Sequence, residues 1–209
     1  MANSHVHSAH RRTQTSRPDP DALYAVAEAQ AGYFTTAQAG SSGYSRSLVT
    51  HHADAGAFMR ARTGVYRLSR FPSSPWEDLF IAWLQAGPRA VVSHDSAMAL
   101  YELSDLLPSE AHFTLPRNSS RRRPQIRMHT SALPPEDVVT REGLPVTSVP
   151  RTIADVARAG LSENLVRQAI RQSLDRGLTT EPLLRDRAEV AGGRARRLIL
   201  AELAGQEDR

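Results

Sequence analysis

The sequence contains no cysteine and no lysine, because all 26 of its basic residues are arginine. Without thiols, disulfides, thiolate metal sites and thiol catalysis are excluded, and a reducing cytoplasm is the natural expectation. Without an amine side chain, Schiff-base chemistry and the lysine-containing sites of many nucleases are excluded too.

Long hydrophobic runs are also missing. No apolar stretch approaches the roughly 20 residues needed to span a membrane. The N-terminal stretch "MANSHVHSAHRRTQTSRPDP" lacks the apolar segment of a signal peptide. We therefore expect no membrane partner and no export, and we expect residues 1–19 to form a disordered polar tail.

The charge that is present is unevenly distributed. Residues 1–71 contain eight arginines and four acidic residues, whereas residues 72–209 contain eighteen of each. The net charge of +4 therefore comes from the first third of the chain. A basic segment of this kind favours a polyanionic partner such as double-stranded DNA.

Residues 20–71 have the pattern of a winged helix-turn-helix. Three predicted helices are followed by "FMRARTGVYRL", which predicts a two-stranded hairpin with its turn at Thr63-Gly64. Such a unit lays its third helix in the major groove of DNA. The residues that mark the helix starts and the last helix stop are Asp19-Pro20, Thr35 or Thr36, Ser45 and Gly56.

The third helix, predicted over residues 46–55, has two unlike sides. Helical spacing turns Leu48, His52 and Ala55 inward, with Val49 beside them, and Asp54 outward. Small polar side chains and arginine near a helix N-terminus can read base edges. The alternative is a solvated polar face, and the Asp54 carboxylate would repel phosphate. The DNA contacts predicted for this helix are Ser45, Arg46, Ser47, Thr50 and His51.

The hairpin predicts a cationic face. With a two-residue turn, alternation puts one set of side chains on an apolar face, namely Met59, Ala61, Tyr66 and Leu68. The opposite face then carries Val65, Arg60, Arg62 and Arg67. Like charges across a hairpin are destabilising, so this face is either solvated or anion-binding. Together with the adjacent helix, the hairpin predicts DNA contacts by Arg60, Arg62, Arg67 and Arg70.

Residues 76–205 predict a second domain of α+β type. An amphipathic helix with aromatic residues on its core face starts at "SPWEDLFIAWL", where Ser74 and Glu77 suggest a capping box. "AVVSHDSAMALYEL" predicts a strand that enters a helix, and "AHFTLP", "QIRMHT", "DVVT" and "LPVTSV" predict strands. Helices follow at about 150–159, 163–176, 181–190 and 194–204. The fold class is thus α+β, an N-terminal winged helix-turn-helix followed by a mixed α+β domain with a helical C-terminal end.

Catalytic patterns are weak. Ser93-His94-Asp95 has the residue types of a hydrolase triad, but consecutive residues cannot align in one hydrogen-bonded row. A helix cap at Ser93 or Asp95 is the better interpretation. No HExxH spacing and no paired Asp-x-Asp motif is present. We therefore expect no catalytic residue, no metal and no cofactor.

A second arginine cluster lies between two predicted strands. Residues 117–127 hold five arginines and no acidic residue. Arginine forks match phosphate oxygens in a bidentate way. The stretch is either a solvated loop or a second phosphate contact by Arg117, Arg121, Arg122, Arg123 and Arg127.

Three segments together resemble the AbiEi family of type IV antitoxins over about residues 21–205: "GYFTTAQAGSSGYSRSLVTHHADAGAFMRARTGVYRL", "VVSHDSAMALYELSDL" and "GLPVTSVPRTIADVA". The resemblance implies an N-terminal winged helix, a C-terminal antitoxin domain and autorepression by binding inverted repeats in the promoter. It also implies a nucleotidyltransferase-like toxin as functional partner, without a stable complex.

In the antitoxin segment, four residues match the family pattern: Thr147, Arg151, Thr152 and Asp155. From the residues themselves we expect structural roles, because Thr147 or Ser148 can cap a helix and Asp155 lies four residues after Arg151. The sequence-based hypothesis is a non-enzymatic, sequence-specific DNA-binding regulator, an autorepressing antitoxin. Two alternatives are a stand-alone regulator without a toxin and a protein-interaction module whose arginines face water.

Overall fold

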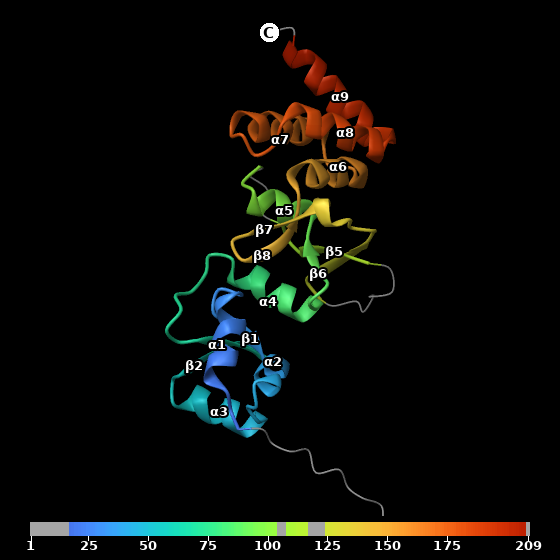
Figure 1. Ribbon diagram of the computed structural model, residues 1–209. Coiled ribbons are helices and arrows are strands. Elements are labelled where there is room, and N and C mark those ends of the chain that lie inside the picture. The colour runs from blue at the N-terminus through green and yellow to red at the C-terminus, as the bar shows by residue number, and fades with distance from the viewer. Residues whose placement is uncertain (1–16, 104–107, 117–123, 208–209) are drawn as a thin grey trace, which may run out of the picture. The chain divides into compact units, whose positions relative to one another are not determined.

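The computed structural model describes residues 17–103, 108–116 and 124–207, and the chain divides into two compact units, residues 1–72 and 73–209. The α+β class and the winged helix at the N-terminus are confirmed (Figure 1). The elements of the N-terminal unit are α1 (Pro20–Glu28), β1 (Tyr33–Thr35), α2 (Thr36–Ser41), α3 (Arg46–Asp54), β2 (Phe58–Arg62) and β3 (Val65–Leu68).

The helices of the N-terminal unit begin where the capping residues predict. Asp19, Thr35 and Ser45 each accept a backbone N–H of the first helical turn, and Thr35 forms a reciprocal capping box with Gln38. The short strand β1 was not predicted. It pairs with β3, so the wing is a three-stranded antiparallel sheet in the order β1-β3-β2.

The predicted register of the hairpin is wrong beyond its tip. Arg62 lies opposite Val65 as expected, but a bulge lies between Arg60 and Arg62, so that Arg60 opposes Tyr66 rather than Arg67. A bulge adds one residue to one strand and reverses the alternation beyond it. The predicted face with three arginines therefore does not form, and Arg60 lies on the face opposite to Arg62 and Arg67.

The bulge also decides which side chain enters the core. Phe58 is buried and its ring meets that of Phe34 edge-to-face at 5.0 Å between centroids, whereas Met59 is 48% exposed. The prediction that Met59 packs inward is wrong for this reason. A large aromatic ring gains more from burial than the methionine that would replace it, which favours the shifted register.

The C-terminal unit contains one mixed five-stranded sheet, in the order β6-β5-β4-β8-β7, with helices packed against it (Figure 1). β4 pairs with β8 and β5 with β6 in parallel, whereas β4–β5 and β7–β8 are antiparallel. Its elements are α4 (Glu77–Ala86), β4 (Val91–Val92), α5 (His94–Leu100), β5 (Ala111–Leu115), β6 (Ile126–Thr130), the 3₁₀ turn η1 (Pro135–Asp137), β7 (Val138–Arg141), β8 (Leu144–Thr147), α6 (Val149–Ala159), α7 (Glu163–Asp175), α8 (Glu181–Ala191) and α9 (Gly193–Glu207).

Two predicted caps of this unit lie at helix starts. Helix α4 begins at Glu77, and the Ser74 hydroxyl accepts the N–H of Trp76, two residues further along the chain, at 3.0 Å. Ser93 occupies the predicted N-cap position of α5, yet its hydroxyl accepts a hydrogen bond from Thr114 at 2.8 Å rather than from the helix. The side-chain cap predicted at Ser93 is therefore not made.

Three histidines of distant segments meet beside Ser93. The rings of His94 and His129 stack at 3.5 Å between centroids, and His129 Nε2 lies 3.4 Å from His112 Nδ1. His94 Nδ1 is 3.0 Å from the buried Ser93 hydroxyl. Asp95 interacts electrostatically with His112 and His129 and not with His94, so the consecutive Ser-His-Asp residues do not form a triad.

Burial keeps these histidines neutral. Removal from water lowers the pKa of His94 to about 3 and that of His129 to about 4, and it also lowers the pKa of His112. The neighbouring Arg127 acts in the same direction on all three, whereas Asp95 raises the pKa of His112 and His129.

The four residues that resemble the antitoxin pattern are buried in the core of this unit. Arg151 Nε bonds Asp155 Oδ2 at 2.8 Å, which confirms the predicted pair, and its Nη1 bonds Asp137 Oδ2 at 2.8 Å. The hydroxyls of Thr147 and Thr152 lie 2.7 Å apart, and Thr152 also donates to the Thr147 carbonyl. Thr147 therefore does not cap α6, and the N-cap residue Ser148 makes no side-chain cap bond.

We predict that the C-terminal unit loses stability in mild acid. Unfolded histidines titrate near pH 6.5, so below this value the unfolded chain binds more protons than the folded unit, and stability falls progressively from about pH 6.5 towards pH 4. Above about pH 6.5 the contribution is fully present. Urea unfolding at about pH 7.5 and pH 5 tests this, with fluorescence as the signal, because both tryptophans, Trp76 and Trp83, lie in this unit. The double variant His94→Gln/His129→Gln should flatten the dependence, and an equally steep one would contradict the assignment.

We predict that Arg151→Ala lowers the unfolding free energy of the C-terminal unit by about 3–5 kcal/mol, since it leaves the buried Asp155 carboxylate without its bonded cation and the buried Asp137 carboxylate with Arg187 alone. Tryptophan-monitored urea unfolding measures the loss. Arg196→Ala is the matched control, because the pair of Arg196 with Glu189 is exposed on both sides and should contribute little. Similar midpoints for the two variants would show that the buried network is not a main source of stability.

Candidate nucleic-acid interface

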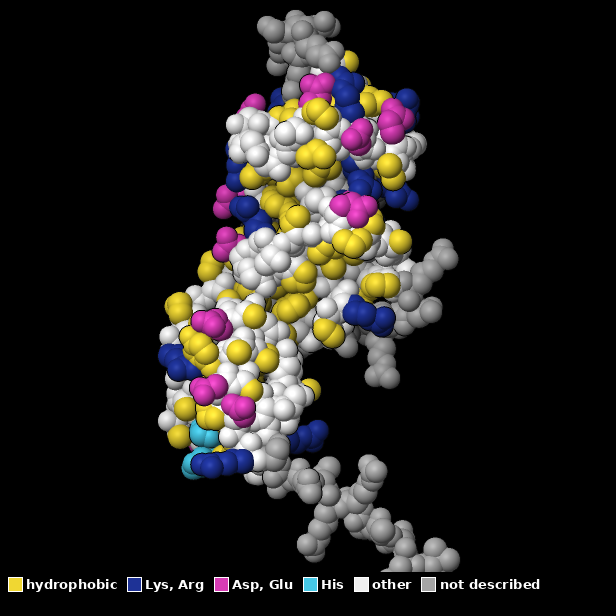
Figure 2. Space-filling view, viewed as in Figure 1, with side chains coloured by type: hydrophobic (Ala, Val, Ile, Leu, Met, Phe, Trp, Pro, Cys, Tyr) yellow, Lys and Arg dark blue, Asp and Glu magenta, His cyan; other side chains and the backbone are white. Residues whose placement is uncertain are grey.

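Helix α3 presents its polar side chains outward. Val49 is buried at 1% exposure, with Leu48 and Ala53 partly buried beside it. The predicted inward position of Ala55 is wrong, because the helix ends at Asp54 and Ala55 is exposed. Histidine and arginine side chains gather at the end of this unit where α3 lies (Figure 2). The predicted outward residues are all exposed: Arg46, Ser47, Thr50, His51 and Asp54.

The hydroxyl groups of this face are partly occupied. Ser45 Oγ accepts the Leu48 N–H at 3.2 Å and lies 2.9 Å from Ser47 Oγ, so Ser45 serves mainly as the cap of α3. Thr50 Oγ1 donates to the Arg46 carbonyl at 3.1 Å and keeps its acceptor capacity. The Arg46 guanidinium has no hydrogen-bond or ion-pair partner among the described residues, and so its donors are available to a ligand.

The wing is fixed to the helices at its tip. Gly64 adopts a φ of +77°, which the tight turn requires, and its carbonyl accepts the backbone N–H of Thr36 at 3.0 Å. The Thr36 hydroxyl donates to the same carbonyl at 3.3 Å. The start of α2 therefore holds the wing in a defined position within the unit.

The four wing arginines divide into two pairs. Arg60 and Arg62 are exposed near the tip. Arg67 donates to the Phe71 carbonyl and lies 6.0 Å above the Tyr33 ring. Arg70 lies 3.9 Å above the centroid of another ring, that of Tyr24. Arg67 and Arg70 thus each contact groups of their own unit, and the sequence did not reveal this because the rings of Tyr33 and Tyr24 come from other segments.

The second arginine cluster is only partly described. Arg117, Arg121, Arg122 and Arg123 lie outside the described residues. Arg127 is exposed on β6, beside the histidines of the C-terminal unit. Among residues 17–103, 108–116 and 124–207, no group of three histidine or acidic side chains is placed to hold a metal ion. Within the same ranges, no helix is long and apolar enough to cross a membrane.

Comparisons with known proteins bear on the N-terminal unit. Residues 21–69 match the family model described as "Transcriptional regulator, AbiEi antitoxin". No curated protein matches the chain. Among solved structures, the crystal structure of RV2827C protein from Mycobacterium tuberculosis is similar at 14% identity and a TM-score of 0.40, over 90% of this chain and 83% of that one.

The family match covers α1 to β3, the elements that form the capped helices and the wing. It confirms the resemblance for this part of the chain and agrees with the exposed polar face of α3. Residues 21–69 of the N-terminal winged helix are therefore similar to the AbiEi antitoxin family of transcriptional regulators.

Proposed function

We propose that the protein is a sequence-specific repressor of its own promoter, where it binds inverted repeats, and that it acts as a type IV antitoxin. The observation that carries the proposal is the combination of an exposed α3 face bearing Arg46 with two exposed wing arginines, in a domain of this regulator family. Both features belong to one compact unit, so they can meet one duplex together.

In the proposed complex, the N-terminal end of α3 lies in the major groove. The Arg46 fork suits the two acceptors of guanine, and Ser47 and Thr50 can contact neighbouring base edges. The His51 side chain can contact either a base edge or a phosphate group. The exposed Arg60 and Arg62 of the wing then contact phosphates or enter the minor groove. Arg67 and Arg70 contribute less to DNA binding, since Arg67 already donates to the Phe71 carbonyl and Arg70 lies against the Tyr24 ring.

The antitoxin part of the proposal rests on the C-terminal unit. Its segment from Thr147 to Asp155 matches the antitoxin pattern of the family and forms a buried structural network rather than an exposed site. We propose a functional partnership with a nucleotidyltransferase-like toxin without a stable complex, and no catalysis by this chain. Co-expression with the toxin of its operon tests this part, and a chain that leaves toxicity unchanged would be a stand-alone regulator.

We predict that Arg46→Ala weakens binding to the upstream DNA of its own gene by about 1–3 kcal/mol and relaxes preference at one base position. Fluorescence anisotropy with that DNA and with random DNA of equal length measures both effects. Asp54→Asn is the control on the same face, and it should strengthen binding, because a carboxylate that repels phosphate is removed. Equal losses on both DNAs would reassign Arg46 to a phosphate contact.

We predict that Arg60→Gln/Arg62→Gln lowers affinity for specific and random DNA alike. Each phosphate contact contributes about −0.9 to the slope of log affinity against log salt, so the double variant should have a slope shallower by about 2 units. Arg67→Gln is the contrasting variant, and it should reduce thermal stability with little change in slope, since Arg67 donates to the Phe71 carbonyl. A folded double variant with the wild-type slope would mean that these arginines face only water, and would favour a protein-interaction module.

A further inference from the structure

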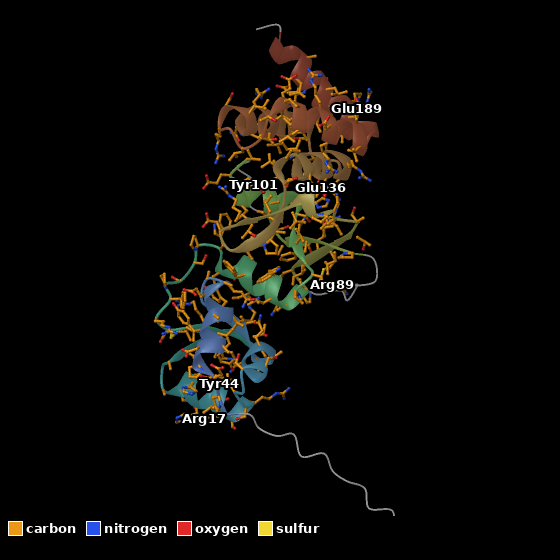
Figure 3. All side chains as sticks on the ribbon, in the orientation of Figure 1. Arg17, Tyr44, Arg89, Tyr101, Glu136 and Glu189 are labelled. Carbon is orange, nitrogen blue, oxygen red and sulfur yellow. The ribbon has the colours of Figure 1, made fainter. Side chains whose placement is uncertain are left out.

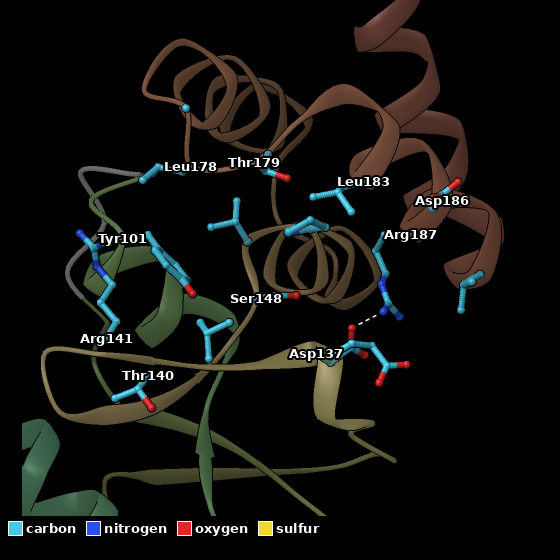
Figure 4. Close-up of a pocket in the computed structure, with 16 residues that line it drawn as sticks. Tyr101, Asp137, Thr140, Arg141, Ser148, Leu178, Thr179, Leu183, Asp186 and Arg187 are labelled. Atoms are coloured by element: carbon cyan, nitrogen blue, oxygen red, sulfur yellow. Dashed lines mark hydrogen bonds and ion pairs between the residues drawn. The ribbon is translucent and has the colours of Figure 1, made fainter. Parts of the chain in front are cut away.

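A cleft of about 650 Å³ opens on the C-terminal unit, in a region that no DNA contact explains. Its walls come from β7, the start of α6, the loop before α8 and one face of α8 (Figure 4). Tyr101 and Glu136, which line it, lie between the sheet and the C-terminal helices (Figure 3). A volume of this size is typical of binding sites.

The rim of the cleft exposes hydrophobic side chains. Among the described residues, four large hydrophobic side chains are exposed, and three of them line this cleft, Val139 at 43%, Leu183 at 54% and Val190 at 76%. Leu183 and Val190 are seven residues apart on α8 and therefore lie on one face. A clustered apolar surface of this kind marks an interaction site.

One buried polar group in the cleft has no partner in the described residues. Thr179 is 8% exposed, and its Oγ1 makes no hydrogen bond. It extends from the loop before α8 into the cleft, towards the same space as Leu183 (Figure 4). An unpaired buried hydroxyl destabilises a fold, so its position points to a hydrogen bond with a bound molecule.

The open edge of the sheet lies along the same cleft. β7 is the last strand of the sheet, and Thr140 lines the cleft. Arg141 and Leu144 close a two-residue turn and form the hydrogen-bonded pair, so the next pair, Thr140 with Pro145, directs its N–H and C=O groups away from the ladder. Thr140 therefore offers one donor and one acceptor to an added strand.

The charges on the cleft select a basic ligand. Arg187 is paired with Asp137, and Arg141 Nε donates to the Leu100 carbonyl at 2.9 Å. Glu136 and Asp186 have no hydrogen-bond or ion-pair partner among the described residues. Arg187 is thus neutralised by Asp137, Arg141 is directed to Leu100, and two carboxylates remain available to basic groups.

We propose that this cleft binds an extended segment of a partner protein by strand addition to β7. The segment places alternate apolar side chains against Val139, Leu183 and Val190, and a group near its middle bonds the Thr179 hydroxyl. Basic residues at its ends meet Glu136 and Asp186. Backbone pairing supplies affinity and the cleft supplies selectivity, as in other cases of strand addition. The proposal does not depend on DNA binding.

A peptide selection tests the proposal on the full chain. A phage-displayed library of random octapeptides is selected on the wild type, and the enriched peptides are synthesised and measured by fluorescence anisotropy. We expect peptides that alternate apolar and polar residues and end in lysine or arginine. Leu183→Glu should weaken them at least tenfold, and Met59→Glu, a change at an equally exposed hydrophobic residue of the other unit, should have no effect. Absence of such peptides, or equal loss in both variants, overturns the proposal.

Two further variants separate strand addition from other modes of binding. Thr140→Pro removes the outward N–H, keeps the hydrogen bonds to β8 and should weaken the peptides about tenfold. Peptides that bind this variant unchanged would occupy the cleft as a helix and overturn the strand geometry. Thr179→Val should weaken binding severalfold while the Tm stays or rises, because an unpaired hydroxyl is replaced by a methyl group of the same shape. A lower Tm with unchanged binding would give Thr179 a purely internal role.

Discussion

The buried charge network around Arg151 is the interaction on which the C-terminal unit depends. The Arg151 guanidinium bonds Asp155 of its own helix α6, and it joins α6 to the segment after β6 through Ser131 and to the turn before β7 through Asp137. Asp137 also pairs with Arg187 of α8. The fold can bury these charges because each has a partner, and Asp137 and Arg187 come from elements that are distant in sequence from one another. Arg151 and Asp137 together thus link α6, the turn before β7 and α8.

The same network shapes the cleft. Arg187 is held by Asp137 and so does not extend freely from α8, which leaves Leu183 and Val190 as the prominent side chains of that helix face. The motif that resembles an antitoxin signature is thus buried beneath the cleft in this structure. Its residues stabilise the elements that form the cleft and are not themselves exposed to a partner. This gives a physical account of a motif with polar residues that are almost entirely buried.

The N-terminal unit is stabilised differently. Its helices rely on local caps, and its wing relies on aromatic contacts of Phe34 and Phe58 and on the bond between Thr36 and Gly64. Among its described residues, the side chains of Arg46, Arg60 and Arg62 are exposed at the surface. Exposed cations are weak contributors to stability. They can therefore serve binding without a large effect on the stability of the unit.

The sequence by itself determined most of the elements, although not β1, because helix caps and strand alternation are local. Asp19, Thr35 and Ser45 predicted three helix starts, and the strands and helices of the second unit fell near their observed bounds. Only the tertiary structure decided the wing register, since the choice between Phe58 and Met59 depends on the ring of Phe34. It also decided which arginines remain exposed, and it alone formed the histidine cluster and the cleft, whose residues come from segments far apart in the chain. Local sequence patterns do not predict contacts between distant segments, because these contacts depend on how the segments pack in three dimensions.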